Sequence, residues 1–337
     1  MITRHTAQDN ASLSRSGRLR ACWQTEPLLL MEGALSERLK HEFHITVDGP
    51  ADMAGLVRDP AARTALGILW RQYLTVAETY GLPLLATTPT RRCDRERAMK
   101  AGLADGDGKS SILAENMDML REIRSEANSR GVAMFAGGLM GCRGDAYTGE
   151  GCLSAEEALQ LHRWQAGLLA EAGADFLYAA LMPTLSESLG MAQAMAETGL
   201  PFFLSFTIRA DGCLVDGTSL HDAIAAIDDS LSSRPLCYMT NCVHPDVVEK
   251  ALSRPMNRTE TVKKRFLGIQ ANAANLSFQE LERSTVTRQS SPQELAGAML
   301  RLRRLFGLRL FGGCCGTTEK HMAAIACALQ GGSGINA

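Results

Sequence analysis

Short runs of apolar residues alternate along the chain with longer segments in which apolar side chains recur at helical spacing. Each short run is apolar at nearly every position, so a strand formed there needs cover on both of its faces. Parallel strands with helices packed against them meet that requirement. The runs predicted to form strands are residues 27–31, 82–86, 132–136, 175–181, 201–206, 236–240, 266–270 and 308–311.

The segments between these runs predict a helix after nearly every strand. Eight strand–helix units in about 300 residues favour a single α/β domain, a (β/α)8 TIM barrel spanning residues 25–330. A doubly wound open sheet is the alternative, but the turn at residues 31–34 lacks the glycine-rich fingerprint of a dinucleotide-binding fold. The predicted helices are residues 66–80, 111–129, 155–172, 186–198, 220–228 and 292–306, and a last one from residue 319.

Three segments fall outside this repeating pattern. Residues 1–24 are expected to form a flexible N-terminal tail, with a transit-like segment in residues 1–20 as the alternative. Residues 331–337 are expected to form a flexible C-terminal tail. Residues 35–66 form a long connection with many charged and helix-breaking residues, and we expect it to form a flap over the site.

Composition and charge exclude some classes of function. Of the 337 residues, 45% are hydrophobic and 21% are charged, as in an ordinary globular protein. The net charge of -2 argues against nucleic acid or an anionic membrane surface as a partner. No apolar run approaches the ~18 residues of a membrane-spanning helix. We therefore expect a cytoplasmic protein with small-molecule partners, and the sequence is compatible with a homo-oligomer.

Ten cysteines lie along the chain without the spacing of a disulfide scaffold, which favours reduced thiols. Cys314 and Cys315 follow the last predicted strand, and Cys242 follows the sixth. Because the carboxyl ends of barrel strands meet at one face, we expect these three thiols to form one metal site. The remaining cysteines are expected to pack in the core: Cys22, Cys93, Cys142, Cys152, Cys213, Cys237 and Cys327.

Other interpretations of these thiols stay open. Cys314 and Cys315 could form a strained disulfide or fill a strand end, and His244 could replace one sulfur as a ligand. If the metal is zinc, it takes thiolates in tetrahedral geometry, and a catalytic site keeps one position open. A substrate thiol in that position would be held as a thiolate, which is a nucleophile for alkyl transfer.

The carboxyl ends of the other predicted strands also carry polar or small residues, and in a barrel these residues would lie at the catalytic end. Glu32 has a simpler interpretation as a loop carboxylate, and Thr88 has one as a helix cap. The residues expected at strand ends, besides the cysteines, are Glu32, Thr87, Thr88, Gly137, Gly138, Ser205, Thr207 and Asn241.

The sequence Gly-Gly-Cys-Cys-Gly-Thr at residues 312–317 resembles the motif that ends the barrel of the zinc-dependent homocysteine S-methyltransferase family. Asn241-Cys242 resembles the Asn-Cys pair of that family. The resemblance implies that Cys242, Cys314 and Cys315 bind Zn²⁺. It also implies that homocysteine is bound by Glu32, Gly33, Thr88 and Asn241. Smaller matches are Thr87, Thr88, Tyr147-Thr148-Gly149, His162, Gln165, Ser205-Phe206-Thr207 and Asp216-Gly217-Thr218-Ser219.

The chain departs from the family at the end of the fourth strand. There the family has a glutamate that contacts the amino group of the substrate, whereas this chain has Ala180. Burying an ammonium group without a partner is costly. Either Glu32 or Glu187 replaces that glutamate, or the acceptor is not homocysteine. Met239 likewise stands where the family favours glycine.

The leading hypothesis is a zinc-dependent methyltransferase that converts homocysteine to methionine. No side chain is expected to act as acid, base or nucleophile, because the metal activates the substrate thiol. The methyl donor is expected to be a free small molecule or to be carried by a partner protein. Two alternatives remain: the acceptor is another small thiol or selenol, or the barrel binds zinc or thiols without turnover.

Overall fold

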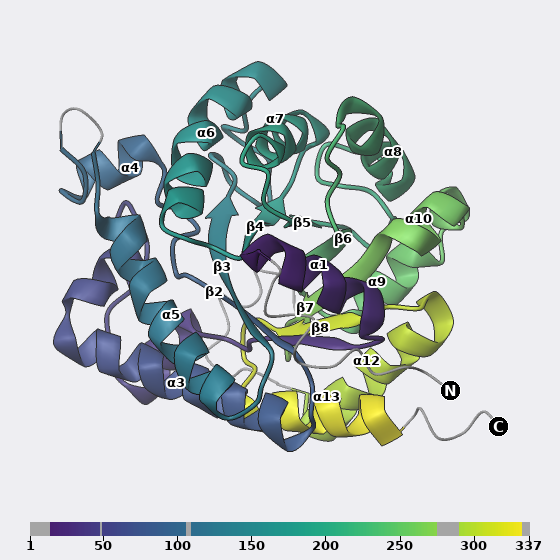
Figure 1. Ribbon diagram of the computed structural model, residues 1–337. Coiled ribbons are helices and arrows are strands. Elements are labelled where there is room, and N and C mark those ends of the chain that lie inside the picture. Colours follow the sequence, from purple (N-terminus) through teal and green to yellow (C-terminus); the bar gives the residue numbers. More distant parts are fainter. Residues whose placement is uncertain (1–13, 48, 106–108, 275–289, 332–337) are drawn as a thin grey trace.

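Eight parallel strands form a closed barrel in the computed structural model, ordered as in the chain from β1 to β8 (Figure 1). The structure describes residues 14–47, 49–105, 109–274 and 290–331. The closed barrel confirms the predicted (β/α)8 fold and excludes the open sheet. Every predicted strand is present with shifted ends: β1 (Leu29–Met31), β2 (Leu84–Thr87), β3 (Met134–Gly141), β4 (Phe176–Met182), β5 (Phe202–Phe206), β6 (Cys237–Val243), β7 (Phe266–Ala271) and β8 (Leu310–Gly313).

Helices surround the barrel as an outer layer (Figure 1). Ser154 and Ser291 each begin a helix with a capping box, in which a glutamate three residues later bonds back to the cap. In the described part of the chain, no helix combines the length and the apolar character needed to span a membrane. The helices are α1 (Arg15–Thr25), α2 (Ser36–Glu42), η2 (Ala54–Arg58), α3 (Pro60–Thr79), α4 (Arg95–Lys100), α5 (Ile112–Ser129), α6 (Ala155–Glu171), α7 (Leu185–Ala196), α8 (Leu220–Ser230), α9 (Pro245–Leu252), η3 (Pro255–Asn257), α10 (Glu260–Arg265), α12 (Pro292–Phe306) and α13 (Glu319–Gly331).

Side chains on each strand alternate between the barrel interior and the helical layer. On β4, Phe176, Tyr178 and Ala180 belong to the inner cluster, whereas Leu177 and Ala179 belong to the core shared with the helices. This alternation follows from the period of two residues in a strand. It also decides which residues near the carboxyl end of each strand face the inside of the barrel.

Helix α1 lies across one end of the barrel (Figure 1). Leu19 is fully buried, and the ring of Trp23 lies 5.5 Å from that of Phe203. The Arg309 guanidinium stacks on Trp23 at 4.2 Å and donates a hydrogen bond to its backbone oxygen. The expected flexible tail over residues 1–24 is therefore wrong for residues 15–24, because their apolar face is buried against the barrel. Ser14 caps this helix, and Gly331, expected to begin the C-terminal tail, is instead the last residue of the final helix (residues 319–331). Residues 1–13 and 332–337 of the expected tails lie outside the described residues.

The connection between β1 and α3 lies at the opposite, carboxyl end of the strands. It contains α2 and η2. Leu35, Lys40, Asp52 and Met53 from this connection line the same cavity as the strand ends. This position agrees with the flap expected from the sequence.

Candidate active site

A cavity of about 410 Å³ lies at the carboxyl end of the barrel strands. Its wall combines the ends of several strands with the connection that follows β1. Barrel enzymes carry their chemistry at this end. Wall residues that the sequence singled out are Glu32, Gly33, Thr87, Tyr147, Ala180, Asn241, Cys242, Cys314 and Cys315.

Three thiols lie together in this cavity. The Sγ atoms of Cys242, on β6, and of Cys314 and Cys315, after β8, all lie within 4.8 Å of one another, and those of Cys242 and Cys315 are 3.6 Å apart. Thiolates bound to tetrahedral zinc at about 2.3 Å are about 3.8 Å apart. The three side chains therefore fit one metal ion and leave a fourth tetrahedral position. All ten cysteines are free, so Cys314 and Cys315 form no disulfide.

Close backbone packing explains the small residues before the cysteine pair. A Cβ atom on Gly313 would lie 2.2 Å from Thr317 Oγ1, a distance that no side chain tolerates. The Thr317 hydroxyl donates a hydrogen bond to Cys314 O at 2.7 Å and accepts one from Ala34 N at 3.1 Å. Thr317 thereby ties the turn that carries the thiols to the segment after β1.

Cys242 combines an unusual backbone conformation with a polarised sulfur. Its φ of 58° lies in the left-handed region, which residues with a side chain rarely adopt. Its Sγ accepts a hydrogen bond from the Tyr147 hydroxyl at 3.1 Å. Hydrogen bonds from Cys314, Cys315 and Tyr147 hold the pKa of Cys242 well below that of an ordinary thiol, and the pKa of Cys314 and Cys315 is raised by Cys242 in turn. A cation bound here would displace the remaining thiol protons.

Glu32 is a buried carboxylate, 3% exposed, directly after β1. Its Oε1 accepts hydrogen bonds from Thr87 N at 2.9 Å and Thr87 Oγ1 at 2.6 Å, and its Oε2 accepts one from Trp70 Nε1 at 3.2 Å. Burial raises the pKa of Glu32 to about 7, and the hydrogen bonds from Thr87 and Trp70 oppose that rise. The carboxylate is therefore fixed in the wall and ionises near neutral pH, where it attracts a cationic group.

Gly33 and Asn241, predicted to bind the acceptor, both line the cavity. A Cβ atom on Gly33 would lie 2.7 Å from the hydroxyl oxygen of Tyr73, so only glycine fits there. The Asn241 Oδ1 atom accepts hydrogen bonds from Leu181 N at 3.0 Å and Ser205 Oγ at 2.6 Å. Asn241 therefore joins the ends of β4, β5 and β6 beside the thiols.

Thr88, also predicted to bind the acceptor, is not among the described residues that line the cavity. Its buried hydroxyl bonds to that of Thr90 at 2.8 Å and accepts a hydrogen bond from Leu139 N at 3.2 Å. Gln165, another residue of the family resemblance, donates to Thr90 O at 2.7 Å in the same network. The geometry therefore favours Thr87 over Thr88 at the site.

Ala180 lines the cavity at the position where the family has its glutamate. Glu187 is placed elsewhere: its carboxylate accepts a hydrogen bond from Arg143 N at 2.6 Å and bonds to His162 Nε2 at 3.1 Å. It anchors the loop that carries Arg143 and is not one of the described wall residues. Of the two carboxylates considered as replacements for the missing glutamate, Glu32 alone is in the wall.

Tyr178 and Gln270 also line the cavity, and the sequence did not single them out. The Tyr178 hydroxyl donates a hydrogen bond to Gln270 Oε1 at 2.8 Å. A signal for Tyr178 exists, because it lies two residues before Ala180 and alternate residues of a strand face the same side. The signal for Gln270 is a polar side chain near the carboxyl end of an apolar run.

His244 is not part of the thiol cluster. It caps α9, where its Nδ1 accepts a hydrogen bond from Asp246 N at 3.3 Å, and burial lowers its pKa. The prediction of core packing is wrong for Cys327, which is exposed on α13. The other cysteines predicted to pack are buried (Cys93, Cys142 and Cys237) or half-buried (Cys22, Cys152 and Cys213).

A family model and two relatives that match most of this chain carry the same description. The sequence model of the family described as homocysteine S-methyltransferase matches residues 29–329. The chain is 24% identical to homocysteine S-methyltransferase of Escherichia coli (strain K12) over 325 residues, which cover 93% of this chain and 99% of that protein. It is 23% identical to homocysteine S-methyltransferase YbgG of Bacillus subtilis (strain 168) over 322 residues, covering 90% and 94% of the two chains.

Solved structures share the fold. The homocysteine methyltransferase MmuM from Escherichia coli in its oxidized form matches with a TM-score of 0.71 at 22% identity, covering 92% of this chain and 98% of that one. Its metallated form matches with a TM-score of 0.69, also at 22% identity, covering 92% and 99%. The family match extends over nearly the whole barrel, including the strand ends that carry the three thiols. The chain therefore belongs to the homocysteine S-methyltransferase family and is a methyltransferase.

Proposed function

We propose that this methyltransferase methylates the thiol of L-homocysteine, giving methionine, and that Cys242, Cys314 and Cys315 hold zinc. The observation that carries the proposal is the cluster of three Sγ atoms within 4.8 Å in a cavity that Glu32 also lines. Its relatives support it, since both are named homocysteine S-methyltransferases and MmuM has a form described as metallated. Three thiolates suit zinc, whereas magnesium and calcium prefer oxygen ligands.

Zinc, when bound, would keep the acceptor thiol ionised near neutral pH, although a free thiol has a pKa of about 8.5. The residues of the chain fix the geometry. Tyr147 holds Cys242 Sγ through a hydrogen bond, and Asn241 fixes the strand ends beside it. As the acceptor sulfur bonds to the methyl carbon, the donor keeps the electron pair of the bond that breaks. When the methyl group is on a cationic sulfur or nitrogen, as in S-methylmethionine or betaine, this step requires no general acid or base from the cavity wall.

Glu32 is the residue that we assign to the ammonium group of homocysteine. Its carboxylate is held by Thr87 and Trp70, so little freedom is lost when the acceptor binds. Ala180 offers no second carboxylate on the opposite strand. That difference favours a second candidate, in which the acceptor is another small thiol or selenol that lacks the amino group.

The test compares Cys314→Ser with Cys327→Ser, a matched control because Cys327 is exposed and outside the cavity. Zinc content is measured by mass spectrometry, and methionine formation is measured from L-homocysteine with a panel of donors. The panel contains S-methylmethionine, betaine, S-adenosylmethionine, a methylated folate and a methyl-corrinoid protein. We expect the wild type and the control to hold about one zinc per chain and to form methionine, and Cys314→Ser to lose both.

Three results would change this assignment. Full activity with normal zinc content in Cys314→Ser would contradict the metal site. Methylation of other thiols or of selenols, but not of homocysteine, would favour the second candidate. Zinc binding without methyl transfer to any acceptor would indicate a barrel that binds zinc or thiols without turnover.

A further inference from the structure

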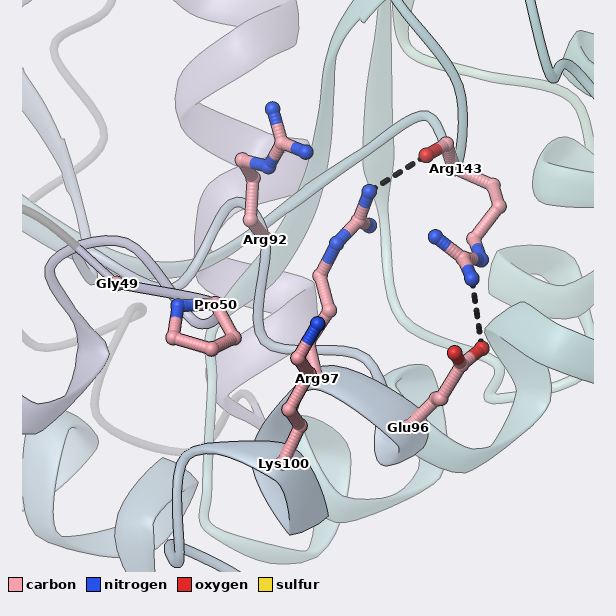
Figure 2. Close-up of a pocket in the computed structure, with 7 residues that line it drawn as sticks. All are labelled: Gly49, Pro50, Arg92, Glu96, Arg97, Lys100 and Arg143. Carbon is pink, nitrogen blue, oxygen red and sulfur yellow. Dashed lines mark hydrogen bonds and ion pairs between the residues drawn. The ribbon is translucent and has the colours of Figure 1, made fainter.

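A basic pocket of about 290 Å³ lies beside the active-site cavity (Figure 2). It is lined by four cationic side chains, Arg92, Arg97, Lys100 and Arg143, and by one acidic side chain, Glu96. Figure 2 shows Arg143, which follows β3, in one pocket with the other four side chains, which all belong to residues 92–100. The excess of positive charge makes the pocket a candidate site for an anion.

The charges of these arginines are balanced to different extents. The Arg97 guanidinium bonds to Asp94 Oδ2 at 2.6 Å and to the backbone oxygen of Arg143 at 2.5 Å. Arg143 pairs with exposed Glu96 at 2.7 Å. Arg92 has no hydrogen-bond or ion-pair partner among the described residues, and no dashed line reaches it in Figure 2. Burial, followed by the nearby charge of Arg97, lowers the pKa of Arg92, which agrees with a surplus of positive charge around it.

Arg92 joins the basic pocket to the active site. It lines the basic pocket, an adjoining hollow of about 540 Å³ and the cavity that contains the thiols. Arg143 lines the first two, and Gly144 and Asp145 line the adjoining hollow and the cavity. The hollow is also lined by Glu150. One extended molecule can therefore contact Arg92 at one end and reach toward the sulfurs at the other.

We infer that the basic pocket binds a phosphate or carboxylate group of the methyl donor, with Arg92 as its main contact. The inference rests on the proposed function, because it names the chemical class of the second substrate. A guanidinium without a partner offers parallel N–H donors that match the two oxygens of such a group. The donor carries its anionic group at one end and a methyl group on nitrogen or sulfur at the other. When the acceptor sulfur bonds to the methyl carbon, the N–C or S–C bond breaks, and its electron pair stays on the donor. A leaving nitrogen that was not cationic also takes up a proton from solvent.

Calorimetric titration tests the anion site directly, with inorganic phosphate and tricarballylate as separate probes at constant ionic strength. Arg92→Gln is compared with Arg95→Gln, which removes the same charge from an exposed position that does not line the pocket. We expect the wild type and Arg95→Gln to bind one of the probes equally well, and Arg92→Gln to bind it at least about tenfold more weakly. Arg92→Lys keeps the positive charge but lacks the paired N–H donors of the guanidinium, so it should recover only part of the affinity.

The choice of probe separates the two sources of negative charge. Tighter binding of phosphate indicates a phosphorylated donor, whereas tighter binding of tricarballylate indicates a polycarboxylate donor. Equal affinities in all the variants, or no binding to the wild type, would overturn the inference. Circular dichroism and the melting temperature show whether Arg92→Gln is folded, and the charge-retaining Arg92→Lys provides a second variant if it is not.

Kinetics then connect the pocket with methyl transfer. For a donor with anionic groups remote from its methyl group, such as 5-methyltetrahydrofolate, Arg92→Gln should raise KM about tenfold and leave kcat unchanged. The anion that binds best should compete with that donor but not with homocysteine. A KM that does not change would overturn the assignment of the pocket to the donor. If no donor supports methyl transfer but anion binding depends on Arg92, the proposed function fails while the anion site stands.

Discussion

Glu32 is a carboxylate of the cavity wall whose ionisation costs more in the folded protein than in water. The carboxylate is buried, and burial raises its pKa from 4.5 to about 7. Glu32→Gln keeps the size of the side chain and removes its titration. The amide of the variant also forms weaker hydrogen bonds with Thr87 and Trp70 than the carboxylate does, but this loss of stability does not depend on pH. The pH dependence of the stability difference therefore isolates the burial of the charge.

The number of protons bound in the folded and unfolded states decides whether stability rises or falls with pH. Between pH 4.5 and 7 the folded protein keeps a proton on Glu32 that the unfolded chain has released, so this group makes stability fall as pH rises. A pKa difference of about 2.5 units corresponds to about 3 kcal/mol, and most of it accumulates between pH 5 and pH 8. We expect the free energy of unfolding of Glu32→Gln, relative to the wild type, to rise by about 2 to 3 kcal/mol over that interval.

Urea unfolding at pH 5 and pH 8, followed by circular dichroism under reducing conditions, measures this difference. Both proteins need the same metal content, because a bound cation changes the field at the carboxylate. A stability difference that stays within about 0.5 kcal/mol between the two pH values would refute the argument, since a carboxylate with an ordinary pKa gives that result. The same variant should lose affinity for homocysteine if Glu32 binds its ammonium group.

Two further substitutions test the packing around the site. Tyr147→Phe removes the hydroxyl that donates a hydrogen bond to Cys242 Sγ. We expect the variant to keep its fold and to bind zinc about tenfold more weakly in a competition assay with a chromophoric chelator. Unchanged zinc affinity would show that this hydrogen bond does not support the metal site. Gly137→Ala places a Cβ atom 2.3 Å from the Phe176 ring and should cost about 1 to 3 kcal/mol of stability in urea unfolding. Gly167→Ala on α6 is its control, because nothing lies within 4 Å of the added atom and the helix should gain up to about 1 kcal/mol.

The barrel could be predicted because each of its strands is a short apolar run between helical patterns. The ends of the strands were less accurate, and β3 shows why. The apolar run was predicted to end at residue 136, but the strand continues to Gly141. Gly137 and Gly138 interrupt the apolar pattern, yet their backbone pairs with β4 at Phe176 and Leu177. Backbone pairing, which does not need a side chain, extends the strand where the pattern stops.

The parts that could not be predicted depend on contacts between segments far apart in the chain. Helix α1 has few apolar residues, and its stability comes from Phe203 and Arg309, which lie on later strands or next to them. Thr87 and Thr88 are adjacent, so their side chains point to opposite sides of the strand. The apolar run alone does not show which of the two faces the inside of the barrel. The three cysteines could be predicted together because all of them follow strands, and the rule that barrel strand ends converge does not depend on local detail.

Ionisation of Glu32 lowers the stability of the free protein and strengthens the binding of a cationic acceptor. Below pH 7 its carboxyl group is protonated, which favours the folded protein but leaves nothing to attract an ammonium group in the cavity. Above pH 7 the carboxylate is charged and buried without a cation, so a cationic acceptor recovers part of the free energy that ionisation costs. With the ammonium group bound at Glu32, homocysteine affinity should rise from pH 6 to pH 8 while the stability of the free protein falls. An affinity independent of pH in this interval would mean that the acceptor does not use Glu32, and would favour a thiol without an amino group.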